Sequence, residues 1–427
     1  MATRKYRRGR RRNKKSPGAS VKIVGLILGA IILMGLLVGV AYAASQFSKI
    51  DRQKVDTESL NLKQESSEKE TGFLNVALFG LDSREGTLGK GNRSDAIMIA
   101  SLNKETGEVK LVSIYRDTLL ETSDNEFNKA NAAYSFGGPE AAIAMINKNL
   151  DMNIEKYVTV NFNALVEVID ALGGMDLELD AVEVGHMNNY CIETAEVTGK
   201  EVPHIQPTSD GPVKYHLNGV QAVSYSRIRY TAGGDFKRSE RQRLVLEKIA
   251  EKASKANIGA LNKIVNVVFP QVSTNFTLAE MLGYAKDVKD YKMSETMGFP
   301  TQNHFDNISG VGSVVIADTL ESNVLEVHKF LFGEDGYTVS DTIRNIQSKI
   351  TVGDSSNVGQ TEYEDDDTQE DVWYGIEEPK TESGYDNNAS SIEDNSQNTT
   401  NDYEEQPEVL PEDDNSADDI NAGEIIE

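Results

Sequence analysis

Cysteine is almost absent from this 427-residue chain, which contains Cys191 alone. A single cysteine forms no intramolecular disulfide and supplies no cysteine-based zinc site. The five histidines show no metal-ligand spacing, and neither a GxSxG motif nor a Walker phosphate loop occurs. These absences exclude a disulfide scaffold, a zinc finger, a hydrolase of the GxSxG type and a P-loop nucleotide enzyme. A folded domain in this chain must be stabilised by its core alone.

Negative charge is abundant but unevenly distributed. The formal net charge is -25, and residues 351–427 contain 25 acidic residues against one lysine. Residues 1–22 contain ten lysines and arginines and no acidic residue. The acidic segment is rich in Asn, Ser and Thr and poor in aliphatic residues, so we predict that it is disordered from about residue 351.

A long apolar run, Ile23–Ala44, contains 22 residues without a charge. At 1.5 Å per residue a helix of this length spans roughly 33 Å, about the thickness of the hydrocarbon core of a bilayer. The basic residues precede the run, so the positive-inside rule predicts a cytoplasmic tail over 1–22, a transmembrane helix over 23–44 and an extracellular remainder. Proximity to a membrane explains the basic cluster and disfavours nucleic acid as a partner.

Two features of this run leave alternatives open. Residues 41–43 (Ala-Tyr-Ala) resemble a signal-peptidase site, but the run exceeds the roughly 7–15 apolar residues of a signal peptide, which favours a retained signal-anchor. Two GxxxG spacings, at 25/29 and 35/39, are of the type that lets membrane helices approach closely. A homodimer through the anchor is therefore an alternative to a monomer.

The rest of the chain divides by composition into three parts. Residues 45–71 are polar and charged, which predicts an extracellular stalk that would reach roughly 30 Å as a flexible coil. Residues 72–335 have the pattern of a globular domain, and 336–427 form a C-terminal extension. Helices interleaved with strands predict an α/β layered domain, with 185–214 as a polar, irregular loop. The expected strands are 74–80, 96–102, 109–114, 157–161 and 175–179, with a hairpin at 103–108, and the expected helices are 138–150, 162–172, 218–227 and 236–255.

Aspartates and arginines recur together at the ends of three predicted strands. Gly80–Arg84 ends the first strand, Arg93–Asp95 precedes the second, and Arg116 with Asp117 follows the third. In open α/β sheets, binding sites gather at the carboxyl ends of strands. A single exposed Asp-Arg pair is usually a surface ion pair of little energetic weight, so the shared location is what favours a functional site.

A second group contains five arginines within 17 residues. It lies on two predicted helices joined by a glycine turn, and Asp235 is expected to cap the second helix. Guanidinium groups bind phosphate oxygens with paired hydrogen bonds and stay charged, so the group would converge on a polyanion; the alternative is a solvated charged face. Positions 238, 241 and 242 share one helix face. The members are Arg227, Arg229, Arg238, Arg241, Gln242 and Arg243.

Carboxylates and arginines together indicate electrostatic chemistry on a phosphate. Asp82 and Asp95 offer the oxygen ligands that suit Mg²⁺. Mg²⁺ and arginines would neutralise the charge that develops when a phosphate ester is displaced. The residues therefore predict a site that holds and polarises a diphosphate while an external hydroxyl attacks it.

At these residues the sequence resembles the LytR–CpsA–Psr (LCP) family of bacterial cell-wall enzymes. The resemblance covers residues 72–335, and the tail, single span and external domain also agree with the family's layout. Two positions depart from the family pattern, because Tyr115 stands where proline is common and Arg243 where glutamine is frequent. The matching segments are Gly80–Arg84 (GLDSR), Arg93–Asp95 (RSD), Ser113–Thr118 (SIYRDT), Asn128–Gly138 (NKANAAYSFGG), Ala171–Asp176 (ALGGMD), Leu217–Arg229 (LNGVQAVSYSRIR) and Gly234–Gln242 (GDFKRSERQ).

The resemblance implies an Mg²⁺-dependent phosphotransferase, with Mn²⁺ as an alternative metal. It would move a glycan phosphate, from a teichoic acid, capsular polysaccharide or similar wall polymer, from a polyprenyl-pyrophosphate carrier to a hydroxyl of peptidoglycan. The implied fold is an α/β/α sandwich around a mixed central sheet, with an apolar channel for the lipid. Residues 165–172 would line that channel or belong to the ordinary core. The implied location is the outer side of a Gram-positive cell membrane.

The resemblance also implies residue roles. Asp82 and Asp95 match metal ligands, and these two with Arg116 and Arg227 are the expected catalytic residues. Two other readings stay open: hydrolysis of the diphosphate by water, and a membrane-tethered wall- or lipid-binding regulator without turnover. The expected diphosphate ligands are Arg84, Arg116, Arg227, Arg229, Asp235, Arg238, Arg241 and Gln242.

Overall fold

The structure, a computed structural model, describes a large central part of the chain. The predicted membrane span up to residue 43, the acidic segment after residue 354, and two predicted site residues, Asp82 and Arg84, lie outside it. Among the helices of the described part, none is both long and apolar enough to cross a bilayer. The described residues are 44–63, 70–81, 83, 87–208, 211–333 and 337–354.

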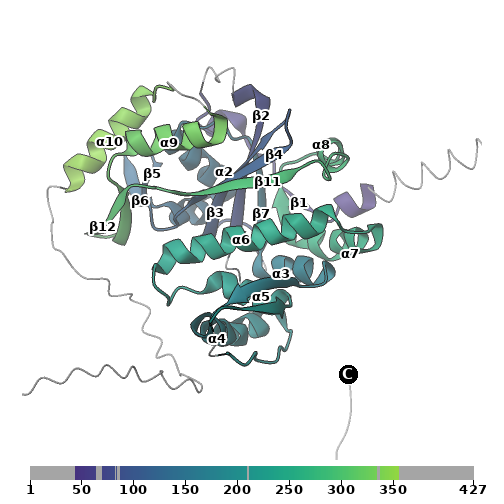
Figure 1. The fold of residues 1–427 in the computed structure, drawn as a ribbon. Coiled ribbons are helices and arrows are strands. Elements are labelled where there is room, and N and C mark those ends of the chain that lie inside the picture. The colour runs from purple at the N-terminus through teal and green to yellow at the C-terminus, as the bar shows by residue number, and fades with distance from the viewer. Residues whose placement is uncertain are drawn as a thin grey trace, which may run out of the picture. The chain divides into compact units, whose positions relative to one another are not determined.

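A mixed seven-stranded sheet forms the centre of the described domain (Figure 1). Its strands, in spatial order, are β1 (Asp51–Arg52), β10 (Val272–Thr274), β7 (Lys156–Asn161), β2 (Phe73–Leu81), β3 (Ser94–Asn103), β4 (Glu108–Ile114) and β11 (Lys292–Phe299). The β2–β3, β3–β4 and β10–β7 pairs are antiparallel, and the β1–β10, β2–β7 and β4–β11 pairs are parallel. The predicted hairpin is confirmed, and its turn contains Gly107 at φ +73°.

Helices flank the sheet, and three two-stranded sheets extend the domain. The small sheets are β5 (Leu119–Ser123) with β6 (Glu126–Lys129), β8 (Met175–Leu179) with β9 (Val213–Leu217), and β12 (Asn303–Ile308) with β13 (Gly312–Ala317). Short 3-10 turns are η1 (Thr57–Ser59), η2 (Glu70–Gly72) and η3 (Phe269–Gln271). The helices are α2 (Ala130–Leu150), α3 (Phe162–Ala171), α4 (Ala181–Thr198), α5 (Gly219–Arg227), α6 (Gly234–Ser254), α7 (Ile258–Val268), α8 (Leu278–Ala285), α9 (Leu320–Phe332) and α10 (Asp341–Asp354).

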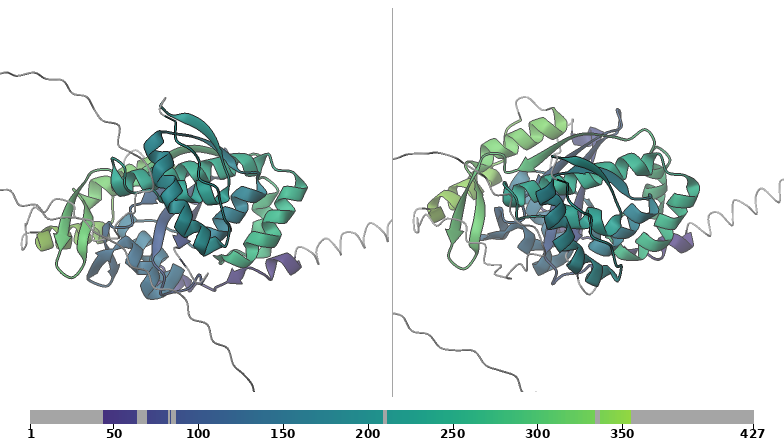
Figure 2. Two further views of the ribbon diagram at one scale, coloured as in Figure 1. Left: turned by 90° about the horizontal axis from the view of Figure 1, so that it is seen from below. Right: turned by 60° about the horizontal axis from the view of Figure 1, so that its bottom comes forward.

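Two apolar cores hold these elements together. The first joins the sheet to α2, α9 and α10, and the Phe79 and Tyr134 rings meet there edge-on at 5.1 Å. The second joins α3, α4, α5 and α6 to β8 and includes Val166 and Ile169, which are fully buried. In both views of Figure 2, α9, α10 and the β12–β13 hairpin lie at one end of the domain, and α7 lies with residues 44–52 at the other.

The predicted loop 185–214 is wrong over its first half, because residues 181–198 form α4. The helix begins with a capping box, in which Asp180 accepts from the Glu183 backbone and Glu183 reaches back. Val184, Met187 and Cys191 recur at helical spacing and are buried. Polar residues fill the positions between them, which conceals the helix in the sequence. The described residues 199–208, between α4 and β9, are not helical.

The helix predicted from Gly138 begins earlier, at Ala130, and Gly138 marks an interruption within it. The φ and ψ angles of Gly138, +70° and -155°, are not helical, and Pro139 follows it. A proline at that position is compatible with a new helical start, because its missing N–H would have no intrahelical acceptor there. The sequence signal therefore located the second helical segment and missed the first.

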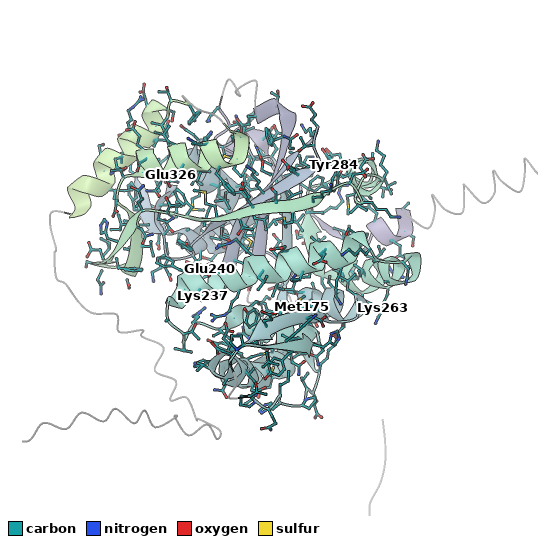
Figure 3. The ribbon with its side chains drawn as sticks, in the orientation of Figure 1. Met175, Lys237, Glu240, Lys263, Tyr284 and Glu326 are labelled. Atoms are coloured by element: carbon teal, nitrogen blue, oxygen red, sulfur yellow. The ribbon has the colours of Figure 1, made fainter. Side chains whose placement is uncertain are left out.

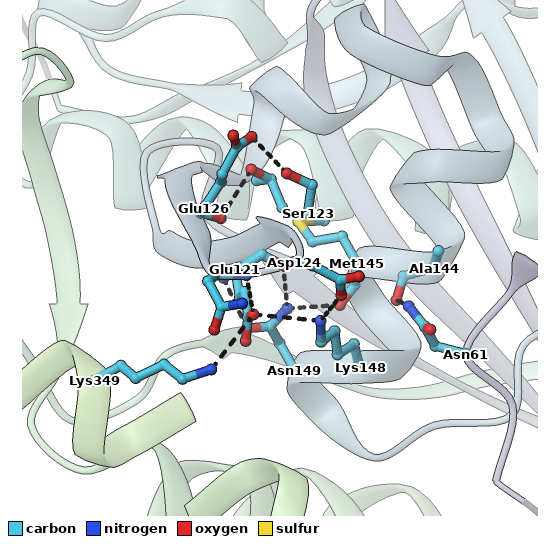
Figure 4. A network of polar contacts seen from close by, with 12 residues as sticks. Asn61, Glu121, Ser123, Asp124, Glu126, Ala144, Met145, Lys148, Asn149 and Lys349 are labelled. Atoms are coloured by element: carbon cyan, nitrogen blue, oxygen red, sulfur yellow. Dashed lines mark hydrogen bonds and ion pairs between the residues drawn. The ribbon is translucent and has the colours of Figure 1, made fainter. Parts of the chain in front are cut away.

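Residues outside the predicted domain bounds of 72 and 335 pack on the folded domain. Within the expected stalk, Ile50 and Leu60 are buried, and β1 forms the edge of the central sheet by pairing with β10. Beyond residue 335, Ile343 and Ile346 on α10 are buried in the first core. Figure 4 shows a second attachment of α10, where Lys349 and Lys148 approach the buried Glu121 carboxylate at 3.7 and 3.3 Å.

Candidate functional site

Asp95 is the centre of the polar site. It is the second residue of β3, and antiparallel pairing places the start of β3 beside the end of β4. Arg116 Nη1 lies 3.0 Å from Asp95 Oδ1, and Arg229 Nη2 lies 3.5 Å from Oδ2. Arg238 Nη2 donates to the Asp95 backbone oxygen at 3.4 Å. Four residues that the sequence placed in one site therefore meet, although two of them are more than 130 positions from Asp95.

These arginines set the charge of Asp95. Burial opposes ionisation of the carboxyl, but Arg116, Arg238 and Arg229 outweigh it and lower the pKa of Asp95 below its ordinary value of 3.8. The carboxylate is therefore ionised at neutral pH and holds the guanidinium groups in place.

Arg116 extends from the loop that follows β4. Its Nε lies 3.4 Å from Asp117 and 3.9 Å from Asp235, in addition to the Asp95 contact of Nη1. Burial would lower the pKa of Arg116, but Asp95, Asp117 and Asp235 together raise it above its ordinary value. The backbone oxygen of Arg116 accepts from Asn131 at 3.0 Å, which ties this loop to α2. Arg116 is thus a permanent cation with a fixed backbone.

Helix α6 contributes Asp235 and Arg238, which form an ion pair of 2.6 Å across one helical turn. The helix is capped by Gly233, at φ +96°, and Asp235 lies within the first turn; the prediction that Asp235 is the N-cap is wrong. A carboxylate in the first turn still interacts favourably with the helix dipole.

Arg238 is the most unusual side chain of the site. Only 2% of it is exposed, and burial lowers its pKa to about 10. Its Nε and Nη1 are buried and have no hydrogen-bond partner within the described part of the chain, and the same holds for Asp235 Oδ2. Buried polar atoms without partners are costly in a native protein. A guanidinium with two vacant donors fits an anionic ligand.

Arg227 lies in the neighbourhood of α4 rather than against Asp95. Its Nη2 pairs with Glu193 at 2.8 Å, and its Nη1 donates to Thr194 Oγ1 at 3.0 Å. The guanidinium carbon lies 4.7 Å from the ring centre of Phe162 and 5.5 Å from that of Tyr190. Aromatic faces on Arg227 restrict its orientation through cation–π contacts.

Arg241 is also held by α4. Its Nη2 and Nε lie 2.9 and 3.2 Å from Glu183 Oε1, and its Nη2 and Nη1 donate to Thr231 Oγ1 and the Ile228 carbonyl. Gln242 is half-buried beside it. Sequence reasoning missed both carboxylates. Glu193 lies in the predicted loop 185–214, and Glu183 lies between that loop and the preceding predicted strand, 175–179. The capping-box spacing of Asp180 and Glu183 was a local signal for the start of this helix.

The metal prediction depends on a residue that is not described. Among the described residues, no group of three or more His, Cys, Asp and Glu side chains is arranged to hold a metal ion. Asp82, the predicted partner of Asp95, lies outside them. The chemistry of the donors that are described fits Mg²⁺, because Asp95 and the unpaired Asp235 Oδ2 are carboxylate oxygens.

Comparison with known proteins gives the class of this protein. The model of the LytR_cpsA_psr family matches residues 37–325. The chain therefore belongs to this family, as the sequence motifs predict.

Individual relatives carry two different names. Over 299 residues, the chain is 30% identical to the Bacillus cereus (strain AH820) protein named polyisoprenyl-teichoic acid–peptidoglycan teichoic acid transferase TagU, covering 66% of this chain and 89% of the relative. It is also 30% identical to biofilm regulatory protein A of Streptococcus mutans, covering 52% of this chain and 56% of that protein. A solved structure titled "TagT bound to LI-WTA" matches with a TM-score of 0.48 at 20% identity, covering 64% of this chain and 95% of that one.

Proposed function

We propose that this protein is an Mg²⁺-dependent phosphotransferase that moves a glycan phosphate from a polyprenyl-pyrophosphate carrier to a peptidoglycan hydroxyl. The observation that carries the proposal is the convergence of Arg116, Arg229 and Arg238 on Asp95, with two buried donors of Arg238 that have no partner among the described residues. The relatives named teichoic acid–peptidoglycan transferases support the same reaction class.

The residues would act mainly by electrostatics. Arg238 Nε and Nη1 would donate to oxygens of the diphosphate, and Arg116 and Arg229, held by Asp95, would face its negative charge. The acceptor hydroxyl would form a bond to the glycan-side phosphorus while the bridging oxygen–phosphorus bond breaks. Its proton would pass to solvent, and polyprenyl phosphate would leave. The arginines would neutralise the charge that shifts onto that leaving group.

Asp95, with Asp82 as the expected second ligand, would hold Mg²⁺. Bound there, the ion would supply Lewis-acid neutralisation of the phosphate oxygens. Arg227 and Arg241 would enlarge the positive surface from the side of α4. The site would lie outside the cell, with the chain anchored in the membrane by the apolar run 23–44 and its basic tail in the cytoplasm.

The test uses the full chain purified in detergent with Mg²⁺, lipid-linked glycan donors and peptidoglycan fragments. Arg116→Ala and Arg238→Met are expected to lower transfer by about 100-fold or more, because removal of one donor that stabilises developing charge typically costs that much. Arg344→Ala is the matched control, since Arg344 is an exposed arginine on α10 that pairs with Asp341 along its own helix. Transfer by Arg116→Ala near the wild-type rate would contradict the site assignment.

The product distinguishes the alternatives. A phosphodiester link between glycan and peptidoglycan supports transfer. Free glycan phosphate as the main product, with acceptor present, would instead identify a hydrolase. No turnover on teichoic acid and capsule donors would favour a regulator, a role suggested by the name of the Streptococcus mutans relative.

A further inference from the structure

The link between the apolar run and the folded domain is short. The run ends at Ala44, and β1 begins at Asp51, where it already pairs with β10 of the central sheet. The six residues 45–50 between them extend over at most about 20 Å. These residues are attached to the domain as well, because Gln46 and Ile50 are buried and Lys49 Nζ donates to Asn266 on α7 at 3.3 Å.

This link restricts which part of the domain faces the membrane. If residues 23–44 span the bilayer, as the proposed function assumes, the β1–β10 edge of the sheet lies next to the lipid headgroups. Thr274, the partner of Arg52 in this edge, is followed within four residues by the start of α8. Helix α8 is further tied to the sheet by Lys156 on β7, which pairs with Glu280 at 2.7 Å. The α8 region therefore has a fixed position relative to the membrane-proximal edge.

Helix α8 carries apolar side chains that the protein does not bury. Its sequence is LAEMLGYA, yet no residue of this helix is buried. Leu282 is 53% exposed, and Val288 in the turn after the helix is 39% exposed. Val288 lies between Asp287 and Lys289 in the sequence, and Lys286 pairs with Asp287 at 3.7 Å; all three charged side chains are exposed. Exposed leucine and valine bordered by lysines are typical of a surface that enters a lipid interface, with the lysine ammonium groups remaining in the headgroup layer.

We infer that the α8 surface, defined as α8 and the turn through Lys289, lies in the interface of the same bilayer that anchors the chain. The bilayer is the occupant because residues 45–50 bring that edge of the sheet to the lipid surface. The apolar atoms of Leu282 and Val288 then enter the headgroup boundary, and the domain makes two contacts with the membrane. The anchor link and the α8 surface together restrict the tilt of the domain relative to the bilayer. A single flexible stalk would not restrict this tilt.

This orientation determines how far the arginines lie from the membrane. In Figure 3, Lys263 and Tyr284 mark the end with α7 and α8, and Lys237 and Glu240 mark the opposite end of α6. Arg238 and Arg241 belong to the same first turns of α6 as Lys237 and Glu240. From Arg241 to Ser254 the helix covers about 20 Å. The diphosphate of a carrier must therefore leave the headgroup layer to reach Arg238.

The experiment places an environment-sensitive fluorophore at Leu282→Cys in the full chain, reconstituted in vesicles of phosphatidylglycerol and phosphatidylcholine with or without doxyl-labelled lipid. Cys191 is buried and stays unlabelled. The matched control is Val182→Cys on α4, which is 57% exposed. We expect a blue-shifted emission and at least twofold quenching by doxyl lipid for the Leu282 probe, and neither for the Val182 probe.

Any other result of the labelling experiment contradicts the inference. Equal quenching at both positions would show no preferred face, and an unshifted Leu282 probe would show that the surface stays in water. A blue shift without lipid quenching would identify a second copy of the protein as the occupant. Loss of flotation with vesicles would remove the anchor on which the inference rests. Transfer activity is measured on the same samples, so quenching without transfer would overturn the proposed function and leave the α8 surface supported.

Discussion

The Nη2 atom of Arg227 lies 2.8 Å from Glu193 Oε2, and this ion pair joins the last turn of α5 to the middle of α4. The Arg227 side chain is 10% exposed and that of Glu193 is 35% exposed. The pair is thus open to solvent on its acidic side. A ligand phosphate that approaches Arg227 meets a guanidinium whose positive charge is already partly neutralised.

Removal of the competing carboxylate should strengthen anion binding. For Glu193→Gln we expect inorganic diphosphate to bind about fivefold more tightly, or about 1 kcal/mol, because a partly exposed ion pair contributes energy of that size. Isothermal titration of the full chain in detergent measures the change. Glu196→Gln is the matched control. It removes the same charge from an exposed position about one helical turn further along α4, and it should leave the affinity near wild type. Weaker binding by Glu193→Gln would mean that Glu193 orients Arg227 rather than competing for it.

The vacant donors of Arg238 should couple ligand binding to stability. Inorganic diphosphate is expected to raise the Tm of the wild-type chain, since a ligand that binds the folded state stabilises it by mass action. Arg238→Met keeps much of the apolar volume and should show little or no increase. Without ligand, its Tm should lie below that of the wild type, because Asp235 loses the guanidinium with which it forms a 2.6 Å ion pair. An undiminished diphosphate shift in Arg238→Met would rule out this residue as an anion ligand.

The lowered pKa of Asp95 predicts how pH changes its contribution. Its ionised form is favoured in the folded state, so its stabilisation is complete above its ordinary pKa of 3.8 and is lost as pH falls through the lower folded pKa. We expect Asp95→Asn to lower the free energy of unfolding by about 2 kcal/mol at neutral pH, the size of a charge-assisted hydrogen-bond contribution. The difference should be the same at mildly acidic pH and shrink below about pH 4.

Denaturant titrations across this pH range measure the difference. Asp341→Asn is the control, because the Asp341 side chain is fully exposed, and it should change stability little at any pH. A deficit for Asp95→Asn that grows on acidification would have the opposite sign and would contradict the assigned ion pairs.

Gly298 on β11 leaves the space that Tyr115 occupies. A Cβ atom at Gly298 would lie 2.0 Å from Tyr115 Oη and 2.6 Å from Cζ. Gly298→Ala should therefore destabilise the fold by about 1–3 kcal/mol through overpacking. Tyr115→Ala should remove most of that penalty in the double variant, and a double-mutant cycle measures this coupling. Gly283→Ala is the control: an added Cβ would meet no other atom within 4 Å there, so this change should be neutral or stabilising. Additive effects of the Tyr115 and Gly298 changes would refute the contact.

Local sequence pattern predicts the elements whose signals are complete within a few residues. The apolar run Leu74–Gly80 and the turn at Gly107 correspond to β2 and the β3–β4 hairpin. Asn218 caps α5, and Gly173 and Gly174, both at positive φ, follow α3. In each case a turn or cap residue and the hydrophobic period agree, so tertiary contacts were not needed for the prediction.

The elements and contacts that local pattern did not predict depend on partners that are distant in sequence. β10 has only three residues, and its place in the sheet comes from pairing with β1 and β7, more than 100 positions away. The same limit applies to the site. Spacing predicted that Arg227 and Arg241 lie close to the other arginines, but not that α4 supplies their carboxylates, since the side chains meet only after α4 packs on α5.

Glu183 takes part in two structures at once. Its Oε2 accepts from the backbone N–H of Asp180 and completes the start of α4, while its Oε1 accepts from Arg241. Fraying of that helical turn would release the guanidinium, and a ligand that draws Arg241 away would loosen the turn. Amide exchange at the beginning of α4 would then report occupancy of the site, so a local helix-to-coil equilibrium and anion affinity share one carboxylate.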